Sequence, residues 1–452
     1  MKNIILIATV FLCCFGGPSI AVAPAVKPHP KKLAANTVKA DNSIRFGPAN
    51  QIGAGINIHF VTGHEKDLDM IAAAGFKFIR TDFVWQGMER VKGVYNWTAF
   101  DELVGNLNKR GIRAIGILCY SSSLYEEASN STNPQTGKVQ RGTASPQHPE
   151  SVAAFARWAA AMAEHFKDSN LIWEIWNEPN ISFWKPKPDV AQYSTLALAT
   201  CKAIRATVPG ATIIGPATSQ VALPYIESFM SSGILEYLDA VSVHPYRNYS
   251  KSPETAIADY QNLRALIEKY APADKKQMPI ISSEWGYSTS TKGVSVDVQA
   301  AYIVRMQLTD VLGGVPISIW YDWKNDGVDP ADHESNFGTV TADLAPKPAY
   351  IAVKTMNTEL NGFTFMQRID VKNDNDYVLL FKNNKGKYKL SAWTMDAVHT
   401  LTIANKVPGA ARATTVDGNG NGLKLKTEKS QLIIDMNALP QYITLKRGIK
   451  LK

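Results

Sequence analysis

Eight short apolar runs constrain the fold of this chain more than any other feature, because helix-like stretches alternate with them. The runs are rich in β-branched residues and span 53–60, 76–82, 113–120, 172–178, 212–218, 240–246, 279–286 and 316–323. Stretches with apolar residues three and four positions apart follow them at 65–74, 100–110, 149–167, 190–208, 255–270, 296–312 and 347–356. Eight strands that alternate with helices predict an α/β fold, a closed (β/α)8 TIM barrel over residues 51–360.

A doubly wound open sheet is the alternative for this pattern. It would need a glycine-rich phosphate-binding turn after the first strand, and residues 57–60 read Asn-Ile-His-Phe instead. Beyond residue 361 the apolar period changes to two, between turns rich in Asn, Asp and Gly. The strands expected there are 377–381, 388–394, 400–403, 431–436 and 441–446. They predict a small antiparallel β-sandwich over residues 361–452.

The N-terminal segment has the pattern of a cleaved secretory signal. Lys2 precedes an apolar run over 4–15, and Ala21-Val22-Ala23 forms a small-residue cleavage site, so we expect a cut after Ala23 and a secreted or periplasmic protein. The run is shorter than a membrane span, and no later stretch reaches the roughly 20 apolar residues that a span needs. Residues 24–50, rich in Pro, Ala and Lys, predict a linker.

The charge and cysteine content exclude several classes of function. The formal net charge is +8, but much of the basic excess lies near the two ends, over 27–39 and 424–452, without a basic helix between them. This distribution argues against a nucleic-acid partner. Once the signal is removed only Cys119 and Cys201 remain, which allow at most one disulfide and no cysteine metal cluster.

Chemistry on a closed α/β barrel collects at the C-terminal ends of the strands, where eight loops meet. Glu178 and Glu284 end the fourth and seventh predicted strands, and aromatic residues flank both. Strands four and seven lie roughly opposite each other, so both carboxyls can point into one cavity. Two facing carboxyls can divide into an acid and a nucleophile, as glycoside hydrolysis requires. The alternative is a pair of structural glutamates held in salt bridges.

The residues around both glutamates resemble the signatures of clan A glycoside hydrolases. Residues 173–180 read Trp-Glu-Ile-Trp-Asn-Glu-Pro-Asn, which is similar to the strand-four motif that carries the acid/base. Residues 283–286 read Ser-Glu-Trp-Gly, which is similar to the strand-seven nucleophile motif. Within the clan the chain is most similar to families 39 and 5, particularly to bacterial exopolysaccharide-cleaving endoglycosidases grouped with family 39. The resemblance covers about residues 50–360.

The resemblance implies a role for each matching residue. Glu178 would be the general acid/base and Glu284 the nucleophile. Asn177 would bind the sugar 2-hydroxyl, Tyr246 would donate a hydrogen bond to Glu284, and Arg80 would place positive charge beside the same carboxylate.

Histidines and tryptophans complete the substrate-binding candidates. His59 and His244 would bond sugar hydroxyls or the groups behind them, although a strand-end histidine is often only structural. A pyranose face stacks on an indole, which makes candidates of Trp85, Trp184, Trp285, Trp320 and Trp323. Trp320 or Trp323 would form the sugar floor, and Trp320 is preferred, the choice being a one-residue register question. Trp85 and Trp184 would line outer subsites or simply cap the barrel.

Two acidic loops have a simpler interpretation than metal binding. Residues 417–428 match the sequence pattern of a twelve-residue calcium-binding loop, but strand-like flanks favour a glycine-rich hairpin turn. The acidic run over 322–332 favours a polar loop after the eighth strand.

The sequence therefore predicts a retaining glycoside hydrolase that cleaves β-glycosidic bonds in a poly- or oligosaccharide with two glutamates, without a metal or an organic cofactor. An endo-acting exopolysaccharide hydrolase is one form of this hypothesis, and an exo-acting β-xylosidase or β-glucosidase is the alternative. A non-catalytic carbohydrate-binding envelope protein is the alternative of another class. The sugar, the linkage and the oligomeric state are left open.

Overall fold

A computed structural model describes residues 45–132, 139–403, 413–424, 426–428 and 431–445. The predicted signal over 1–23 and residues 24–44 of the predicted linker lie outside the described residues. In the part of the chain that is described, no helix combines the length and the apolar character needed to cross a membrane.

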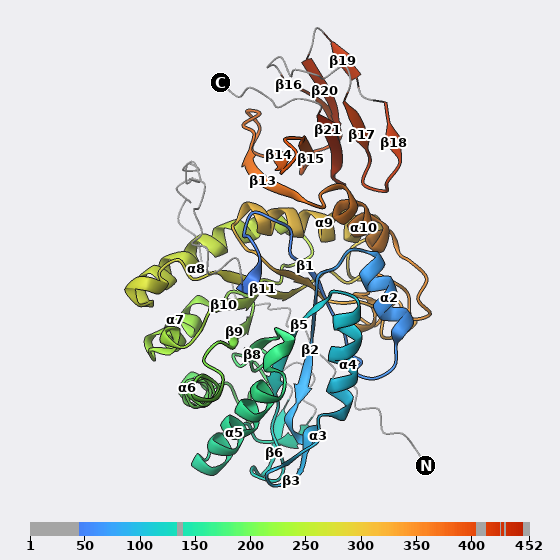
Figure 1. Cartoon of the computed structure of the whole chain (residues 1–452). Helices are drawn as coiled ribbons and strands as arrows, with labels where there is room; N and C mark the ends of the chain where they lie inside the picture. Colours follow the sequence, from blue (N-terminus) through green and yellow to red (C-terminus); the bar gives the residue numbers. More distant parts are fainter. Residues whose placement is uncertain (1–44, 133–138, 404–412, 425, 429–430, 446–452) are drawn as a thin grey trace, which may run out of the picture.

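Eight parallel strands close into a barrel, as the alternating pattern predicts (Figure 1). In barrel order they are β1 (Ala54–Asn57), β12 (Ser318–Trp320), β11 (Ile280–Trp285), β10 (Ala240–His244), β9 (Thr212–Ser219), β8 (Ile172–Ile175), β5 (Arg113–Cys119) and β2 (Phe78–Val84). Each of the eight predicted runs overlaps one of these strands. The prediction of a (β/α)8 barrel is therefore confirmed, and the doubly wound alternative is excluded.

A helix follows each barrel strand. These helices are α2 (Glu65–Ala73), α4 (Thr98–Lys109), α5 (Pro149–His165), α6 (Val190–Thr207), α7 (Leu223–Ser231), α8 (Ala256–Tyr270), α9 (Val296–Leu312) and α10 (Pro348–Glu359). The seven predicted helices are present. The sequence pattern did not indicate α7, a short helix with proline in its first turn. Cys119 and Cys201 are both buried and free, so no disulfide joins them.

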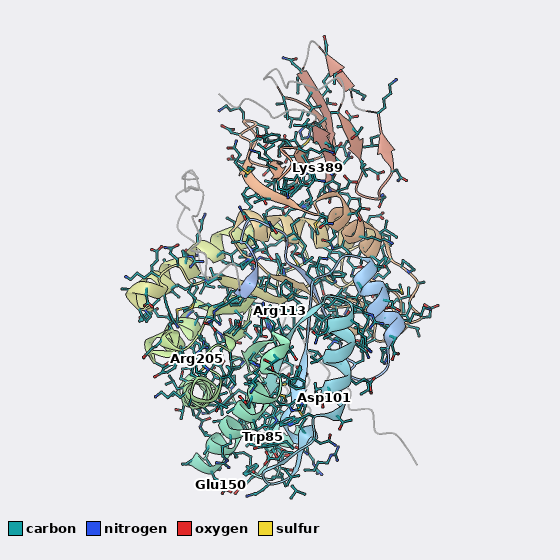
Figure 2. All side chains as sticks on the ribbon, viewed as in Figure 1. Trp85, Asp101, Arg113, Glu150, Arg205 and Lys389 are labelled. Carbon is teal, nitrogen blue, oxygen red and sulfur yellow. The ribbon has the colours of Figure 1, made fainter. Side chains whose placement is uncertain are left out.

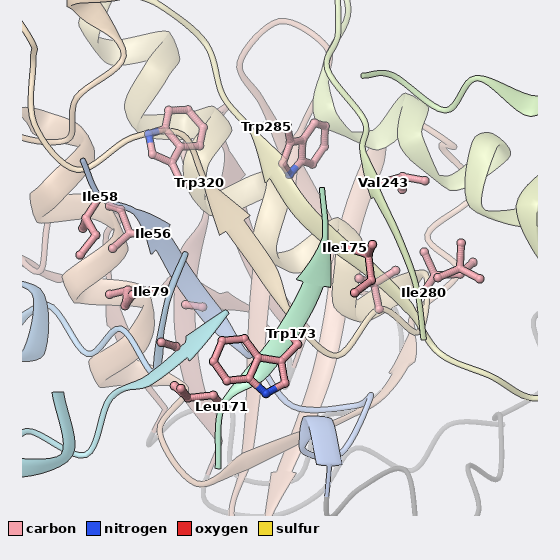
Figure 3. Packing of buried hydrophobic residues seen from close by; sticks show 14 of the residues in the cluster. Ile56, Ile58, Ile79, Leu171, Trp173, Ile175, Val243, Ile280, Trp285 and Trp320 are labelled. Atoms are coloured by element: carbon pink, nitrogen blue, oxygen red, sulfur yellow. The ribbon is translucent and has the colours of Figure 1, made fainter. Parts of the chain in front are cut away.

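Strand alternation sorts the barrel core into two layers. Ile115, Ile172, Ile281 and Ile319 pack inside the barrel with residues from the other strands. The neighbouring strand positions point outward and pack against the helices, as Figure 3 shows for part of this second cluster. The inward positions at the C-terminal ends of the strands are therefore the ones that reach the mouth.

The floor of the barrel is closed by Phe46. Its ring is 1% exposed and packs against the inward residues at the N-terminal ends of the strands. Arg45 fixes this segment by donating to the carbonyl oxygens of Gly210 and Ala211. Residues 45–50, predicted to belong to the linker, thus include a part that packs on the barrel, because Phe46 is apolar and fills the floor.

The C-terminal domain is a two-sheet antiparallel sandwich that packs beside α9 and α10 (Figure 1). One sheet has the order β13 (Phe363–Arg368), β14 (Asp376–Asn383), β15 (Tyr388–Thr394), β21 (Gln441–Leu445), β17 (Thr414–Val416) and β18 (Gly422–Leu423). The other has the order β16 (His399–Ile403), β20 (Gln431–Met436) and β19 (Lys426–Glu428). The five predicted strands are present; β13, β17, β18 and β19 were not indicated because their residues are short runs or largely exposed.

Buried polar contacts join the sandwich to the barrel. Arg305 of α9 donates to both carboxylate oxygens of Glu254, at 2.7 and 2.8 Å, and Trp393 of β15 donates to Glu254 at 2.7 Å. Lys389, labelled in Figure 2, donates to the Glu359 carbonyl at the end of α10 at 2.6 Å. The sandwich is thus anchored to the last two barrel helices.

The glycine-rich segment after β17 is a hairpin turn, as predicted. The Asp417 side chain accepts hydrogen bonds from the backbone N–H groups of Asn419 and Asn421, at 2.9 and 2.8 Å. The chain then returns as β18, antiparallel to β17.

Candidate active site

One hydrogen-bonded network at the barrel mouth contains six of the predicted site residues, contributed by strands β2, β8, β10 and β11 and the loops that follow them. They are Arg80, Asn177, Glu178, His244, Tyr246 and Glu284. The strand ends therefore bring together residues that are separated by up to about two hundred positions in the chain.

Arg80 is the centre of this network and is 1% exposed. Its guanidinium donates to Glu174 at 2.7 Å, to Glu284 at 2.5 Å and to the Asn177 side-chain oxygen at 2.8 Å. Burial opposes the charged form, but Glu174 and Glu284 raise the pKa of Arg80 above its usual value. Arg80 thus stays cationic, and its planar fork orients three side chains at once.

Glu178 is buried and lies in a strained stretch of backbone. Trp176 and Glu178 have φ angles of 69° and 45°, in the left-handed region that non-glycine residues seldom adopt. The Glu178 backbone N–H donates to the Ala217 carbonyl at 3.0 Å, which holds this turn against β9. Burial raises the pKa of the Glu178 carboxyl to about 7, although a hydrogen bond from Ser219 opposes the rise. This carboxyl can therefore hold a proton near neutral pH.

His244 connects the two halves of the network. Arg80 Nη2 lies 3.1 Å from His244 Nε2, and His244 Nδ1 lies 3.0 Å from Glu178 Oε1. Because a guanidinium can only donate, Nε2 accepts, and the Nδ1–H group donates to Glu178. Burial lowers the pKa of His244 to about 4, so the imidazole is neutral at physiological pH. Among the options the sequence left for His244, the structure places it behind the carboxylates.

Glu284 is held from two sides. Arg80 Nη1 contacts one carboxylate oxygen and Tyr246 donates to the other at 2.9 Å. Burial and the adjacent Glu284 charge raise the pKa of Tyr246 well above its usual value, so its phenol keeps the proton that it donates. The register of β11 against β12 shifts between Ser282 and Trp285, at the point where Glu284 turns toward the mouth.

The two glutamate side chains face each other across a short gap. One ligand atom from each of Glu178, His244 and Glu284 lies within 4.8 Å of the other two. The polar environment of each carboxyl differs, since Arg80 contacts Glu284 directly and His244 contacts Glu178. This arrangement can separate a proton-holding carboxyl from an ionised one.

Trp285 and the two tryptophans predicted for the sugar floor, Trp320 and Trp323, point away from the mouth. Trp285 and Trp320 have no exposed surface and belong to the cluster between strands and helices, where Figure 3 shows both. Trp320 Nε1 donates to the Phe337 carbonyl, and Trp323 Nε1 donates to Asp67 of α2. The predictions for these three residues are corrected. Ile319 faces inward, so alternation directs Trp320 outward and turns its neighbour Tyr321 toward the mouth.

Trp85 and Trp184 are likewise core residues rather than exposed subsites. Trp85 is fully buried, stacks on Tyr125 and Trp158, and donates to Glu89. Trp184 is fully buried, packs on Trp176 and donates to Gln192. In both cases the alternative weighed from the sequence, a cap on the barrel, describes the observed position.

His59 lies at the edge of the mouth, where 44% of its side chain is exposed. Its Nε2 atom is 3.6 Å from Asp322 Oδ2, and its ring contacts the Tyr321 ring edge-on. His59 is accessible from solvent but lies outside the Arg80 network.

Sequence reasoning assigned no role to several residues of the mouth: Asn57, Tyr120, Glu174, Tyr321 and Asp322. Glu174 is buried, and although burial opposes it, Arg80 lowers its pKa, so it is the permanent counter-ion of Arg80. Tyr120 shares a hydrogen bond of 3.1 Å with Asn177. A signal for Glu174 was present, because strand alternation places it on the inward face two residues after the inward-facing Ile172.

Comparison with known proteins agrees with this geometry. A family model described as Cellulase (glycosyl hydrolase family 5) matches residues 48–327, more than half of the chain. A curated β-xylosidase from Geobacillus stearothermophilus is 23% identical over 298 residues, covering 59% of this chain and 57% of that protein. The chain thus aligns with little more than half the length of this relative.

Solved structures show the same architecture. A family 39 glycoside hydrolase from the gut symbiont Bacteroides cellulosilyticus WH2 matches with a TM-score of 0.75 and 25% identity, over 88% of this chain and 81% of that chain. A GH39 β-xylosidase from Caulobacter crescentus matches with a TM-score of 0.64 and 18% identity, over 89% of this chain and 97% of that chain. The second likeness shows the fold alone. Because the family model covers more than half of the chain, the chain belongs to the cellulase family, glycosyl hydrolase family 5, within clan A of the glycoside hydrolases.

Proposed function

We propose that this protein is a retaining glycoside hydrolase that cleaves β-glycosidic bonds, with Glu178 as the acid/base and Glu284 as the nucleophile. The observation that carries the proposal is the pair of opposed carboxyls, which lie close together in different environments. Glu178 holds its proton near neutral pH because it is buried, whereas Glu284 receives a cationic and a phenolic hydrogen bond. In this assignment Glu178 protonates the leaving oxygen while Glu284 attacks the anomeric carbon.

The short gap between the carboxyls supports retention over inversion. Retaining sites hold their carboxyls about 5 to 5.5 Å apart, whereas inverting sites need about 6.5 to 9.5 Å to seat a water molecule. Here one carboxylate oxygen of each glutamate lies within 4.8 Å of the other; this is a distance between single oxygens, and it supports the shorter spacing. Glu284 would then form a glycosyl-enzyme intermediate, and water activated by Glu178 would hydrolyse it from the same face.

The surrounding residues fit this assignment. Arg80 and Tyr246 hold Glu284 in one orientation by hydrogen bonds to its two carboxylate oxygens. Asn177 uses its oxygen for Arg80 and is 3.1 Å from Tyr120 through its amide nitrogen. That nitrogen carries two hydrogens, so one is left to bind the sugar 2-hydroxyl.

For the substrate, we propose a β-linked poly- or oligosaccharide, with endo-acting cleavage of an exopolysaccharide as the first candidate. An exo-acting β-xylosidase is the second candidate, because the curated relative carries that name. Sizing the products of the purified chain separates the two. Endo action gives a ladder of oligosaccharides early in the reaction, whereas exo action releases a single sugar from the first time point.

The function is tested with aryl β-glycosides and a panel of β-glycans. We expect Glu178→Gln and Glu284→Gln to lower turnover of a natural glycan by several orders of magnitude, and Glu268→Gln on the exposed face of α8 to have no effect. Proton NMR should show the β-anomer first. Wild-type turnover in either active-site variant, or an α-anomer released first from a β-linked substrate, would overturn the assignment. Sugar binding without any hydrolysis would favour the non-catalytic alternative.

We also propose that the protein acts outside the cytoplasm, on the strength of the signal-like residues 1–23. N-terminal sequencing of the exported protein should begin at Pro24. Recovery of the uncut chain in the cytoplasmic fraction would contradict this.

A further inference from the structure

A second group of metal-type side chains lies at the mouth, beside the two glutamates rather than between them. It consists of His59, which follows β1, and Asp322 and Asp326, which follow β12. Their ligand atoms all lie within 4.8 Å of one another, and His59 Nε2 is 3.6 Å from Asp322 Oδ2. β1 and β12 are neighbours in the barrel, so the fold unites residues from its first and last strands.

The carboxyl of Asp322 is buried without hydrogen bonds from the described residues that would stabilise its charged form, and burial raises its pKa well above the usual value. Asp322 is only 2% exposed, and its side chain faces His59 through Oδ2. Among the described residues, none donates a hydrogen bond to Asp322 Oδ1. A buried and unpaired carboxylate oxygen is costly, and it indicates a ligand that the protein chain itself does not supply.

Two neighbouring lysines, Lys324 and Lys347, place positive charge near the group but make their ion pair and hydrogen bonds with other residues. Lys324 pairs with Asp67, at 3.6 Å, on the α2 side. Lys347 donates to Thr289 and Asn325, at 3.1 and 3.4 Å. Neither ammonium group therefore occupies the position between His59 and the two aspartates.

The group formed by Glu178, His244 and Glu284 is less suited to a metal ion. Ligand atoms of Glu178, His244 and Glu284 also lie within 4.8 Å of one another. Arg80 and Tyr246 already bond to polar atoms of this group, and the Arg80 cation lies against Glu284. A metal ion there would face a positive charge. The group at β1 and β12 contains no arginine and has one unsatisfied oxygen.

We propose that His59, Asp322 and Asp326 bind one divalent transition-metal ion, of the Mn²⁺ or Zn²⁺ class. One imidazole and two carboxylates form a mixed nitrogen and oxygen donor set, which suits these ions better than Ca²⁺ or Mg²⁺, whose ligands are oxygens. His59 and Asp326 are exposed, so the ion reaches the site from solvent.

Three protein ligands leave coordination positions open for water or a sugar hydroxyl. The ion would also tie the loop after β12 to the end of β1. The glutamate chemistry proposed above does not depend on it, and the acidic run over 322–332 gives no hint of it by itself, because the sequence does not place His59 beside that run.

The test is calorimetric titration of MnCl₂ into the full chain after treatment with EDTA and dialysis. We expect one saturable site, with affinity at least about tenfold weaker in His59→Gln and in Asp326→Asn, since even loss of an outer partner costs 10–100-fold. Both residues are exposed, so both variants should fold. Asp329→Asn, on the same loop but outside the group, is the matched control and should bind like the wild type.

Three outcomes would overturn the proposal: no saturable binding to the wild type, equal affinity in Asp326→Asn and Asp329→Asn, or loss of binding in Glu284→Gln. The last outcome would place the ion between the catalytic glutamates. Binding of Mn²⁺ by a protein that hydrolyses no glycan would leave this site standing while refuting the proposed function, so the two failures are distinguishable.

Discussion

Replacement of Glu178 by glutamine should stabilise the folded protein at neutral and alkaline pH. The folded state holds the Glu178 proton up to about pH 7, because burial raises that pKa from 4.5. The unfolded chain releases the same proton near pH 4.5. Between these values the folded state binds more protons than the unfolded state, so the free energy of unfolding falls as the pH rises.

The size of the effect follows from the difference between the two pKa values. At about 1.4 kcal/mol per unit, the ionised Glu178 carboxyl costs the folded protein about 3 kcal/mol above pH 7. Glutamine carries no charge and can still accept the hydrogen bond from His244. The Glu178→Gln variant should therefore match the wild type at pH 4 and exceed it in stability by up to about 3 kcal/mol at pH 8.

Urea denaturation of both proteins, followed by tryptophan fluorescence from pH 4 to pH 8, measures this difference. Glu254→Gln is the matched control of opposite sign. Burial opposes ionisation of Glu254, but the hydrogen bonds from Arg305 outweigh burial and lower the pKa of Glu254. The contribution of ionised Glu254 to the free energy of unfolding is therefore present above the unfolded pKa and is lost as the pH falls. A stability difference between Glu178→Gln and the wild type that does not change with pH would refute the reasoning.

Three further outcomes are expected. The value of kcat/KM should fall as the pH rises, with an apparent pKa near 7. This alkaline decrease should disappear in Glu178→Gln assayed with a nitrophenyl glycoside, whose leaving group needs no acid. An unchanged alkaline decrease in the variant would assign that pKa to another group. Trp320→Phe should lower the melting temperature but leave KM within about twofold, whereas Tyr246→Phe should lower kcat, because of these two residues Tyr246 donates to Glu284 and Trp320 is fully buried. A large rise of KM in Trp320→Phe would restore the sugar-floor role. Gly286→Ala should destabilise the protein by about 1–3 kcal/mol in the same urea assay, because its Cβ would lie 2.0 Å from the Tyr321 carbonyl oxygen; a neutral result would show that the two strands can separate there.

The barrel and the meeting of Glu178 and Glu284 at its mouth could be predicted from sequence because both depend on patterns that repeat along the chain. Eight alternations of strand and helix leave few other folds, and parallel strands place Glu178 and Glu284 at the same end of the barrel. Strand positions are set to within a residue or two, which is enough to locate a strand end. It is not enough to say which side of the strand a given residue faces.

The tryptophans show where this limit lies. Trp320 and Tyr321 are adjacent, and a shift of one residue exchanges which of them faces the mouth. An apolar indole is also as suitable for the core as for a sugar platform, so residue type could not separate the two roles of Trp85 and Trp184. Asp322 and His59 escaped notice as a pair because they are contributed by the last and the first strands, whose adjacency exists only after the barrel closes.

The aromatic plug at Phe46 determines how this molecule can be mounted on a surface. The ring of Phe46 seals the N-terminal end of the barrel strands, opposite the Arg80 network. A linker joined ahead of Arg45 would therefore start at that sealed end. An enzyme immobilised on a bead through that end would present the mouth of the barrel outward to a polymer in solution. Attachment through the sandwich would instead bring the support alongside α9 and α10, so the two orientations should differ in their access to large insoluble glycans.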